Sequence, residues 1–244
     1  AIRSRGLGDV YKRQVKFLTK NSIFFILLFG FYACTKDTSK TSLSVYCNII
    51  NEKLYSFSRL SNFEKKKFDE LKQSRFQKYE DDFHEAAEKF GVEWELLAAV
   101  AFQESQWNPR ARSATQVKGM MMLTLPTAAS VGVTNRLDPI QSIHGGAQYI
   151  ADLKSNNNYG TSSGDKIAFI LASYNLGTTN IKNAINTIGK KPIEVTWLDL
   201  EGYLLNLKTS MDSENYSRGQ QTVDFVERVR DYYYLLLAQN CNDS

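Results

Sequence analysis

The sequence predicts a mainly α-helical, single-domain fold over about residues 61–240, and three observations support this prediction. Apolar residues recur there at three- and four-residue spacing, as they do on one face of a helix. Clusters of Gly, Ser and Asn, such as those at 156–160 and 162–164, separate the apolar stretches. The alternation of apolar and polar residues that is typical of strands is nearly absent. With 244 residues, of which 43% are hydrophobic, the chain is long enough to bury a sizeable core.

The first 34 residues have the character of a leader. Residues 1–14 show no helical period and differ in character from the rest of the chain, so we interpret them as non-native or artefactual. Residues 15–33 resemble a signal peptide, with two lysines ahead of the apolar run IFFILLFGFYA, which is too short for a usual bilayer span. The run ends in Phe-Tyr-Ala-Cys, which resembles a bacterial lipobox and implies cleavage before Cys34 and lipidation of that residue. An uncleaved short anchor is the alternative.

Residues 34–60 are rich in Ser, Thr, Lys and Asn, which predicts a polar tether. If Cys34 carries a lipid, Cys47 and Cys241 remain, and an even pair in an oxidising compartment favours a disulfide between them. Two unpaired, partly buried thiols are the alternative. Three scattered Cys and two His exclude a zinc cluster built from Cys and His repeats, and we expect neither a metal nor an organic cofactor.

Inside the domain, helix signals succeed one another along the chain. The tetrapeptide SNFE at 61–64 forms a capping box, and the helical pattern that it starts closes at Gly91. A second helix is predicted over 94–106, and the Asn-Pro pair at 108–109 prevents it from continuing. Further segments with helical period or caps span residues 138–155, 165–175, 179–188, 195–207 and 222–239.

The charge of the chain is unevenly distributed. Residues 1–34 hold six Lys and Arg against one Asp, so the net charge of +4 comes from the leader. The rest of the chain is close to neutral. The domain therefore gives no electrostatic reason to expect nucleic acid as a partner.

Glu104 stands out within the helix predicted over 94–106. It lies seven residues after Leu97 and continues the apolar stripe that Leu97 and Val100 form on one face of the helix. Its carboxyl group is therefore expected to be partly desolvated. It also falls in the last helical turn, where the helix dipole disfavours negative charge. Both effects raise its pKa towards that of a general acid that works near neutral pH. An ion pair with Arg110 or Arg112 at the helix end is the alternative.

Four motifs include or come after Glu104. They are ESQWNP at 104–109 with ARS at 111–113, GMMM at 119–122, ASYNLG at 172–177 and FVERVRDYY at 225–233. In this order and spacing they resemble the lytic transglycosylases with a lysozyme-like catalytic domain. The sequence GMMMLT, with DP at 138–139 and SIHGG at 142–146, is most similar to the membrane-bound lytic murein transglycosylase F group. The resemblance covers about residues 75–238 and implies a mainly-α, lysozyme-like fold of the goose-type or SLT kind.

The resemblance implies an activity and a role for individual residues. The family's usual reaction cleaves the β-1,4 bond between N-acetylmuramic acid and N-acetylglucosamine in peptidoglycan and leaves a 1,6-anhydro ring. Glu104 stands at the position of the single catalytic acid, which we expect to act first as acid and then as base, whereas most glycosidases use two carboxyl groups. Tyr174 and Asn175 match the pair that lines the cleft at the scissile bond. Positions along the sugar-binding groove are matched by Ser113, Met121 and Met122.

The sequence departs from the wider family pattern at four positions. The family often has Gln at the position of Met122, where the F group is similar to this sequence. Gln116 replaces a common Gly and is an awkward occupant if that turn needs a positive φ. Gln221 and Phe225 stand where Glu and Tyr are frequent. The F group also usually carries an N-terminal solute-binding-like domain, for which the stretch after Cys34 leaves no room. The family implies a monomer that is lipid-anchored, faces the periplasm from the outer membrane, and acts on peptidoglycan strands.

Other residues have less specific interpretations. His84 lies outside the motifs and His144 stands at the open third position of SIHGG, so we expect structural roles for both. Aromatic side chains at helical spacing usually pack in the core rather than on sugars, which applies to Trp107, Tyr149, Tyr203 and Tyr232 to Tyr234. Two other functions fit the same fold: a muramidase similar to goose-type lysozyme, whose products contain one more water, and a lipoprotein that binds peptidoglycan without turnover.

Overall fold

The computed structural model of the 244-residue chain describes residues 43–54, 56, 58–114, 116–207 and 213–242. The predicted leader, the signal peptide and Cys34 lie outside the described residues, so the expectations about them remain predictions. The chain separates into two units, residues 1–52 and 53–244.

A helix over residues 43–54 lies inside the stretch for which the sequence predicts a polar tether. Leu43, Tyr46 and Ile50 succeed one another in it at three- and four-residue spacing, a pattern that the high content of Ser, Thr and Asn obscures. Leu43, Val45, Tyr46 and Ile49 are exposed. The segment between the predicted lipidation site and the domain is therefore helical in part.

Residues 62–90 form two helices, where the sequence predicts one continuous helical pattern. α2 (Asn62–Ser74) begins with the predicted capping box, and α3 (Glu80–Phe90) ends at Gly91, whose φ of 65° suits glycine. The short 3-10 helix η1 (Phe76–Lys78) separates them. Phe76 is fully buried there, with its ring 4.9 Å from that of Trp107. Core packing of this ring therefore stabilises the break between the two helices.

Five of the remaining helices agree within two residues with the predicted segments, whereas the last one, α10 (Ser213–Asn242), begins nine residues before and ends three residues after the predicted 222–239. Two short helices, α5 (Leu125–Ser130) and η2 (Pro192–Glu194), were not predicted. α5 has too few residues to show a helical period, although Thr124 caps it. Asp138, Ser162 and Thr196 cap three of the others by accepting hydrogen bonds from backbone N–H groups of the first turn. The other helices are α4 (Trp94–Ser105), α6 (Pro139–Ser155), α7 (Ser163–Leu176), α8 (Thr178–Ile188) and α9 (Trp197–Asn206).

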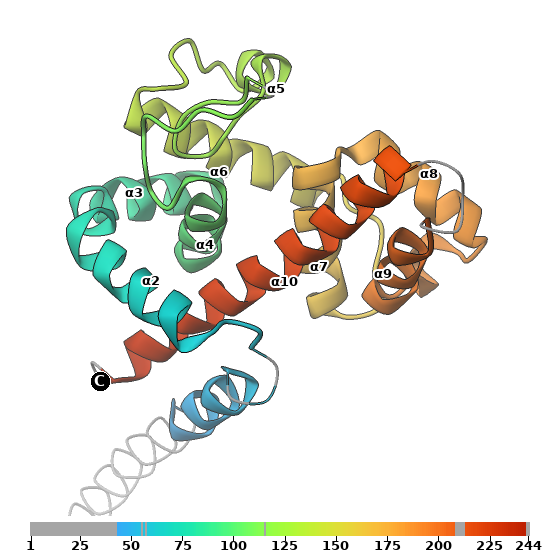
Figure 1. The fold of residues 1–244 in the computed structure, drawn as a ribbon, viewed down its shortest axis with the longest axis horizontal. Helices are drawn as coiled ribbons and strands as arrows, with labels where there is room; N and C mark the ends of the chain where they lie inside the picture. Colours follow the sequence, from blue (N-terminus) through green and yellow to red (C-terminus); the bar gives the residue numbers. More distant parts are fainter. Residues whose placement is uncertain (1–42, 55, 57, 115, 208–212, 243–244) are drawn as a thin grey trace, which may run out of the picture. The chain divides into compact units, whose positions relative to one another are not determined.

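Two groups of helices share one hydrophobic core, and α10 crosses both of them (Figure 1). α3 packs against α4 and α6, while α8 packs against α7 and α9. α10 contacts α4, α7 and α9, and α6 contacts α7. Residues 96–102 of α4 are all buried, as expected for a helix that is apolar on every side. The C-terminal end of this central helix therefore has a fixed position.

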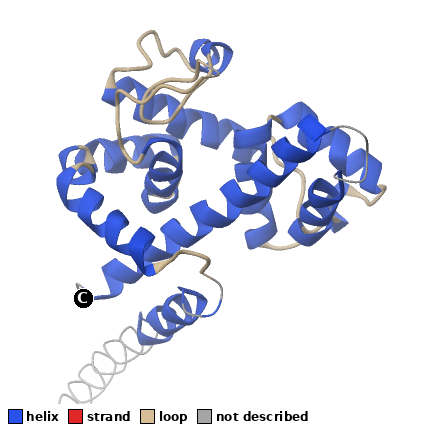
Figure 2. Cartoon of the chain, viewed as in Figure 1, coloured by secondary structure: helices blue, strands red, loops and turns tan. Residues whose placement is uncertain are grey.

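The described residues contain helices and loops but no β-strand (Figure 2), which confirms the mainly-α prediction. Two isolated bridges, Arg112 with Lys118 and Lys118 with Leu123, fold the loop after α4 back on itself. No helix among the described residues has the length and apolar character needed to cross a membrane.

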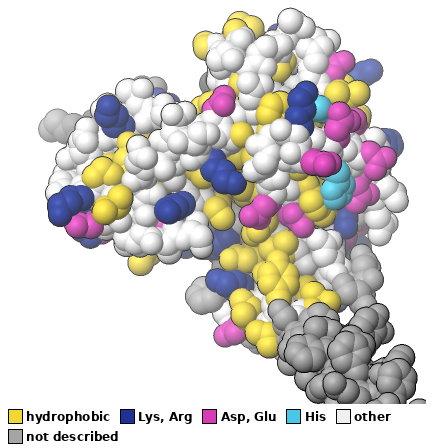
Figure 3. Space-filling model, turned by 180° about the vertical axis from the view of Figure 1, so that it is seen from behind, with side chains coloured by type: hydrophobic (Ala, Val, Ile, Leu, Met, Phe, Trp, Pro, Cys, Tyr) yellow, Lys and Arg dark blue, Asp and Glu magenta, His cyan; other side chains and the backbone are white. Residues whose placement is uncertain are grey.

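Exposed charges of both signs are mixed on the face of the molecule shown in Figure 3. Some of the surface charges pair with each other, such as Lys190 with Asp199 at 2.7 Å and Lys191 with Glu194 at 3.3 Å. This face carries no continuous basic stripe of the kind that neutralises a phosphate backbone.

Candidate active site

Glu104 lies in the last turn of α4, as predicted, where the helix leaves the core. Gln106 adopts a left-handed conformation with a φ of 53° and ends the helix. The Glu104 side chain is partly exposed, so it stands at the boundary between core and solvent. Burial by the surrounding protein raises its pKa from 4.5 to about 8. The carboxyl group is therefore mostly protonated at neutral pH, as a general acid must be.

The Glu104 carboxyl group has no partner in the described part of the chain. Neither an ion pair nor a hydrogen bond holds it there, so the alternative pairing with Arg110 or Arg112 is not formed. Burial alone raises the pKa of Glu104, without a contribution from a second carboxylate. The site is therefore built around one protonated acid.

Trp107 anchors the loop after α4. Its side chain is fully buried, and its Nε1 donates a hydrogen bond to the Ala98 carbonyl at 2.9 Å. Its ring packs against those of Phe68, Phe76 and Phe102. Trp107 is therefore a core residue, as expected for most aromatics at this spacing, and fixes the loop beside Glu104.

Two hydroxyl groups hold the loop over residues 106–124 against the helices. The Ser105 hydroxyl donates a hydrogen bond to the Met120 carbonyl at 2.7 Å. The backbone N–H of Met121 donates to the hydroxyl of Ser142, a fully buried residue of α6, at 3.1 Å. The position of the loop next to Glu104 is thus set from both α4 and α6.

Arg136 fixes the tip of the same loop. Its guanidinium group donates hydrogen bonds to the carbonyl groups of Gln116 at 3.0 Å and Leu123 at 2.8 Å. Gly119 is required in this loop, because a Cβ there would lie 1.7 Å from the Arg136 carbonyl oxygen. Gln116 has a φ of 64°, so the turn does need the left-handed conformation in which Gln is an awkward occupant.

The three residues predicted to line the sugar-binding groove differ in their surroundings. Ser113 and Met122 are partly exposed residues of this loop, and Met122 has a φ of 47°. Met121 is fully buried and packs so closely on Gly146 that a Cβ there would lie 2.6 Å from its Cε. The prediction of a groove-lining side chain is therefore wrong for Met121. The left-handed turn at the adjacent residue directs neighbouring side chains to different sides.

Tyr174 is close to Glu104, as the motifs imply. Burial raises the pKa of Tyr174 well above its usual value, and the negative charge of Glu104 raises it further. The Tyr174 hydroxyl donates a hydrogen bond to the Met121 carbonyl at 2.7 Å. Its ring lies 5.3 Å from that of Tyr149 and stacks at 6.2 Å on Phe225. Helices α4 and α7 thus place Glu104 and Tyr174 near enough for the charge of one to act on the other.

Asn175 is exposed next to Tyr174 at the end of α7. Its side-chain oxygen accepts a hydrogen bond from the Thr222 hydroxyl of α10 at 2.9 Å. Sequence reasoning missed Thr222 and Arg136, since neither lies in a motif position with a recognised role. Ser142 did lie in the quoted SIHGG motif, so a signal for it was present.

Each of the two histidines packs beside an aromatic ring, and their expected structural roles remain a prediction. The His84 ring is 4.5 Å from that of Trp94, and the His144 ring is 6.2 Å from that of Phe90. The described residues contain no cluster of three His, Cys, Asp or Glu side chains able to hold a metal.

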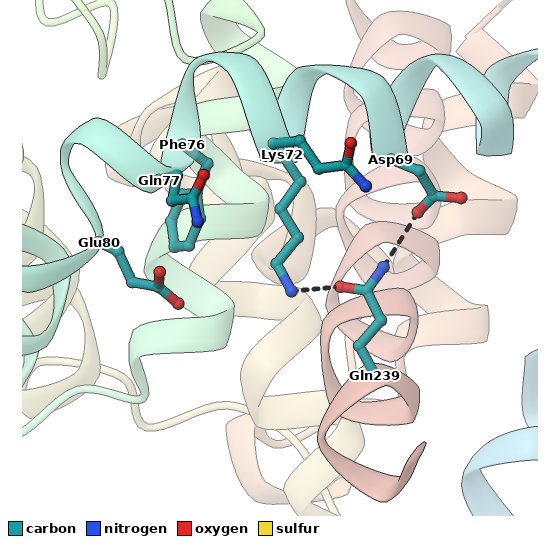
Figure 4. Close-up of a pocket in the computed structure, with 7 residues that line it drawn as sticks. Asp69, Lys72, Phe76, Gln77, Glu80 and Gln239 are labelled. Atoms are coloured by element: carbon teal, nitrogen blue, oxygen red, sulfur yellow. Dashed lines mark hydrogen bonds between the residues drawn. The ribbon is translucent and has the colours of Figure 1, made fainter. Parts of the chain in front are cut away.

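A separate cavity of about 490 Å³ lies between α2, η1 and the end of α10 (Figure 4). Gln239 spans it by accepting a hydrogen bond from Lys72 at 2.6 Å and donating one to Asp69 at 3.0 Å. Because no motif residue lines this cavity, and Gln239 already pairs with Lys72 and Asp69 across it, it is not the candidate active site.

Comparison with known proteins agrees with this geometry. Residues 81–196 match the family model described as the transglycosylase SLT domain. These residues are an SLT domain. The acid, the loop and the Tyr-Asn pair all lie inside it, whereas Thr222 and Phe225 lie on α10, beyond its end. The predicted mainly-α, lysozyme-like fold and the predicted resemblance to lytic transglycosylases are confirmed.

Relatives of the SLT domain carry more specific names. The chain is 40% identical over 169 residues to the membrane-bound lytic murein transglycosylase F of Stutzerimonas stutzeri, an alignment that covers 67% of this chain and 35% of that protein. It is 39% identical over 196 residues to the protein of that name from Shewanella loihica, an alignment that covers 77% of this chain and 40% of that protein. The chain therefore spans well under half the length of these relatives. The solved lytic transglycosylase Slt of Pseudomonas aeruginosa is 18% identical with a TM-score of 0.48, over 67% of this chain and 24% of that one.

Proposed function

We propose that this protein is a peptidoglycan lytic transglycosylase in which Glu104 is the only catalytic carboxyl group. The observation that carries the proposal is the carboxyl group itself. It has a pKa raised to about 8 by burial, has no hydrogen-bond or ion-pair partner among the described residues, and lies beside Tyr174 inside an SLT domain. A protonated, unpaired acid next to a cleft tyrosine is equipped to donate its proton to a substrate.

In the first half of the reaction, Glu104 donates its proton to the glycosidic oxygen between N-acetylmuramic acid and N-acetylglucosamine. The bond from that oxygen to C1 of the muramic acid then breaks, and the leaving sugar departs as an alcohol. The positive charge that develops at C1 is stabilised by the 2-acetamido oxygen of the substrate. A second enzyme carboxylate, which most glycosidases need, is therefore not required.

In the second half, the ionised Glu104 accepts the proton of the C6 hydroxyl of the same muramic acid. The C6 oxygen bonds to C1, which closes the 1,6-anhydro ring and restores the protonated acid. No water enters the product. The raised pKa suits both halves, because a group that titrates near the working pH both donates and accepts a proton readily.

Residues next to Glu104 position the substrate and the acid. Tyr174 is held by its hydrogen bond to the Met121 carbonyl, so its ring forms a fixed wall of the cleft. The exposed Asn175 side chain is held by Thr222 and is available to a sugar substituent. Ser113 and Met122, on the loop over residues 106–124, are partly exposed and complete the proposed groove.

The leader and the cysteines support a proposed cellular setting. We place the protein in the bacterial cell envelope, as a monomer bound to the membrane by a lipid on Cys34 and facing the periplasm, with the outer membrane as its site. We also propose a disulfide between Cys47 and Cys241. Peptide mapping by mass spectrometry with and without reductant tests it, and alkylation of both thiols in unreduced protein would exclude it.

Digestion of purified peptidoglycan, with products analysed by mass, tests the proposed function. Wild-type protein should release 1,6-anhydro-muropeptides, and Glu104→Gln should release none while it keeps the fold. Products heavier by one water would indicate a muramidase instead. Binding to peptidoglycan without any release by the wild-type protein would indicate a non-catalytic binding protein. Near-normal turnover by Glu104→Gln would refute the role of Glu104.

A further inference from the structure

A second, smaller cavity opens beside the Tyr-Asn pair. It has a volume of about 160 Å³ and lies between the end of α7, α8, α9 and the first described side chains of α10. Its polar lining consists of Asn180, Asn183, Tyr203 and Arg218, and its apolar lining includes Leu176 and Leu204. The described residues that line it include no acidic side chain.

This cavity shares a wall with the candidate active site. Leu176, which lines it, is the residue directly after Asn175. Arg218 stands one helical turn before Thr222, and the Thr222 hydroxyl lies 2.8 Å from the Arg218 carbonyl and 2.9 Å from the side-chain oxygen of Asn175. A group attached to a sugar at Asn175 therefore has a short path into the cavity.

The lining has the chemistry of a carboxylate site. The exposed guanidinium group of Arg218 forms no ion pair with any residue that the structure describes. A guanidinium group binds a carboxylate through two parallel hydrogen bonds, and the neighbouring amides of Asn180 and Asn183 add neutral donors and acceptors. The ring of Tyr203 and the leucines offer apolar contact to a short side chain. The volume equals that of about five water molecules, which suits one small amino-acid residue.

We propose that this cavity binds a carboxylate of the peptide stem that muramic acid carries in peptidoglycan, with Arg218 as the residue that recognises it. The proposal rests on the proposed function, since it assigns a further part of the same substrate to the protein. Binding of the stem aligns the muramic acid beside Asn175 and makes strands with peptide stems better substrates than strands without them.

Kinetics on two matched substrates test the proposal. One is a set of purified glycan strands with their peptide stems, and the other is the same set after an amidase has removed the stems. We expect Arg218→Gln to raise KM about tenfold on strands with stems and to leave kcat unchanged. On stripped strands it should change neither constant. Arg218→Lys should restore part of the lost affinity, because it keeps the charge but not the two-pronged geometry.

Two controls separate the possible failures. Lys182→Gln removes an exposed cation from the same helix as Asn183, outside the cavity, and should leave both substrates unaffected. An equal loss for Arg218→Gln on both substrates, or no loss on either, would overturn the proposal. Calorimetric binding of the free stem tripeptide to the Glu104→Gln protein needs no turnover. Binding that depends on Arg218 would support the stem site even if the wild-type protein released no anhydro product, a result that would refute only the proposed function.

Discussion

Replacing Glu104 by Gln should abolish activity and at the same time stabilise the fold. The wild-type carboxyl group has a pKa of about 8 when folded and near 4.5 when unfolded, because only the folded state buries it. Gln has nearly the same shape and does not ionise. The substitution therefore removes the free-energy cost of burying this acid at pH values where the unfolded chain would ionise it.

The magnitude comes from proton linkage. The folded protein keeps a proton that the unfolded chain releases above pH 4.5, so wild-type stability falls as pH rises from 4.5 to 8 and is not lowered further by this group above that range. At pH 7 the full effect would be about 3.4 kcal/mol. Because the Glu104 side chain is partly exposed and screened by solvent, we expect a stabilisation by Gln of about 1–3 kcal/mol at pH 7 and almost none at pH 4.

Urea unfolding of both proteins at a series of pH values between 4 and 9 measures this difference. The difference in unfolding free energy should grow between pH 4.5 and 8 and then level off. Glu88→Gln, a change at an exposed carboxyl group of α3, is the control and should show no such growth. A Glu104→Gln protein that is no more stable than wild type at pH 7 would refute the claim that burial strains this carboxyl group.

The same site leads to three further predictions. Activity, measured as kcat/KM, should fall about tenfold for each pH unit above 8, because only the protonated Glu104 starts the reaction. A value of kcat/KM at pH 9 equal to that at pH 8 would mean that another group is the acid. Gly146→Ala should lower the unfolding free energy by about 1–3 kcal/mol and reduce kcat, because the new Cβ displaces Met121 and, through it, Tyr174. Gly202→Ala is the control: it lies on α9 with open space around it and should stabilise the protein. Gln116→Gly should raise the unfolding free energy by about 0.5–1 kcal/mol by relieving the positive φ, and a loss of stability would contradict this.

Local sequence patterns predicted the helices and the acid because both depend on neighbours in the chain. The capping box at Ser61 and the apolar run before Glu104 need only the adjacent residues to specify a helix start and a desolvated carboxyl group. Tyr174 could be placed near Glu104 only through its motif, since 70 residues separate them in the sequence and helical spacing says nothing about their distance.

The errors arose where tertiary packing decides the structure. The break at Phe76 depends on a buried ring that packs against Trp107, from a later segment. The burial of Met121 depends on the backbone turn at residues 119–122 and on the absence of a side chain at Gly146. Arg136 donates a hydrogen bond to the Gln116 carbonyl, and Thr222 donates one to the Asn175 side chain. Because these partners lie 20 and 47 residues away in the sequence, no local pattern identifies either residue.

The origin of the oxygen atoms in the product tests the central claim most directly. Purified peptidoglycan is digested in water enriched in ¹⁸O, and the new muramic acid ends are analysed by mass spectrometry. If Glu104 acts as acid and then as base on the C6 hydroxyl, these ends contain no label and have the mass of the anhydro sugar. Labelled ends that are heavier by one water would contradict the account.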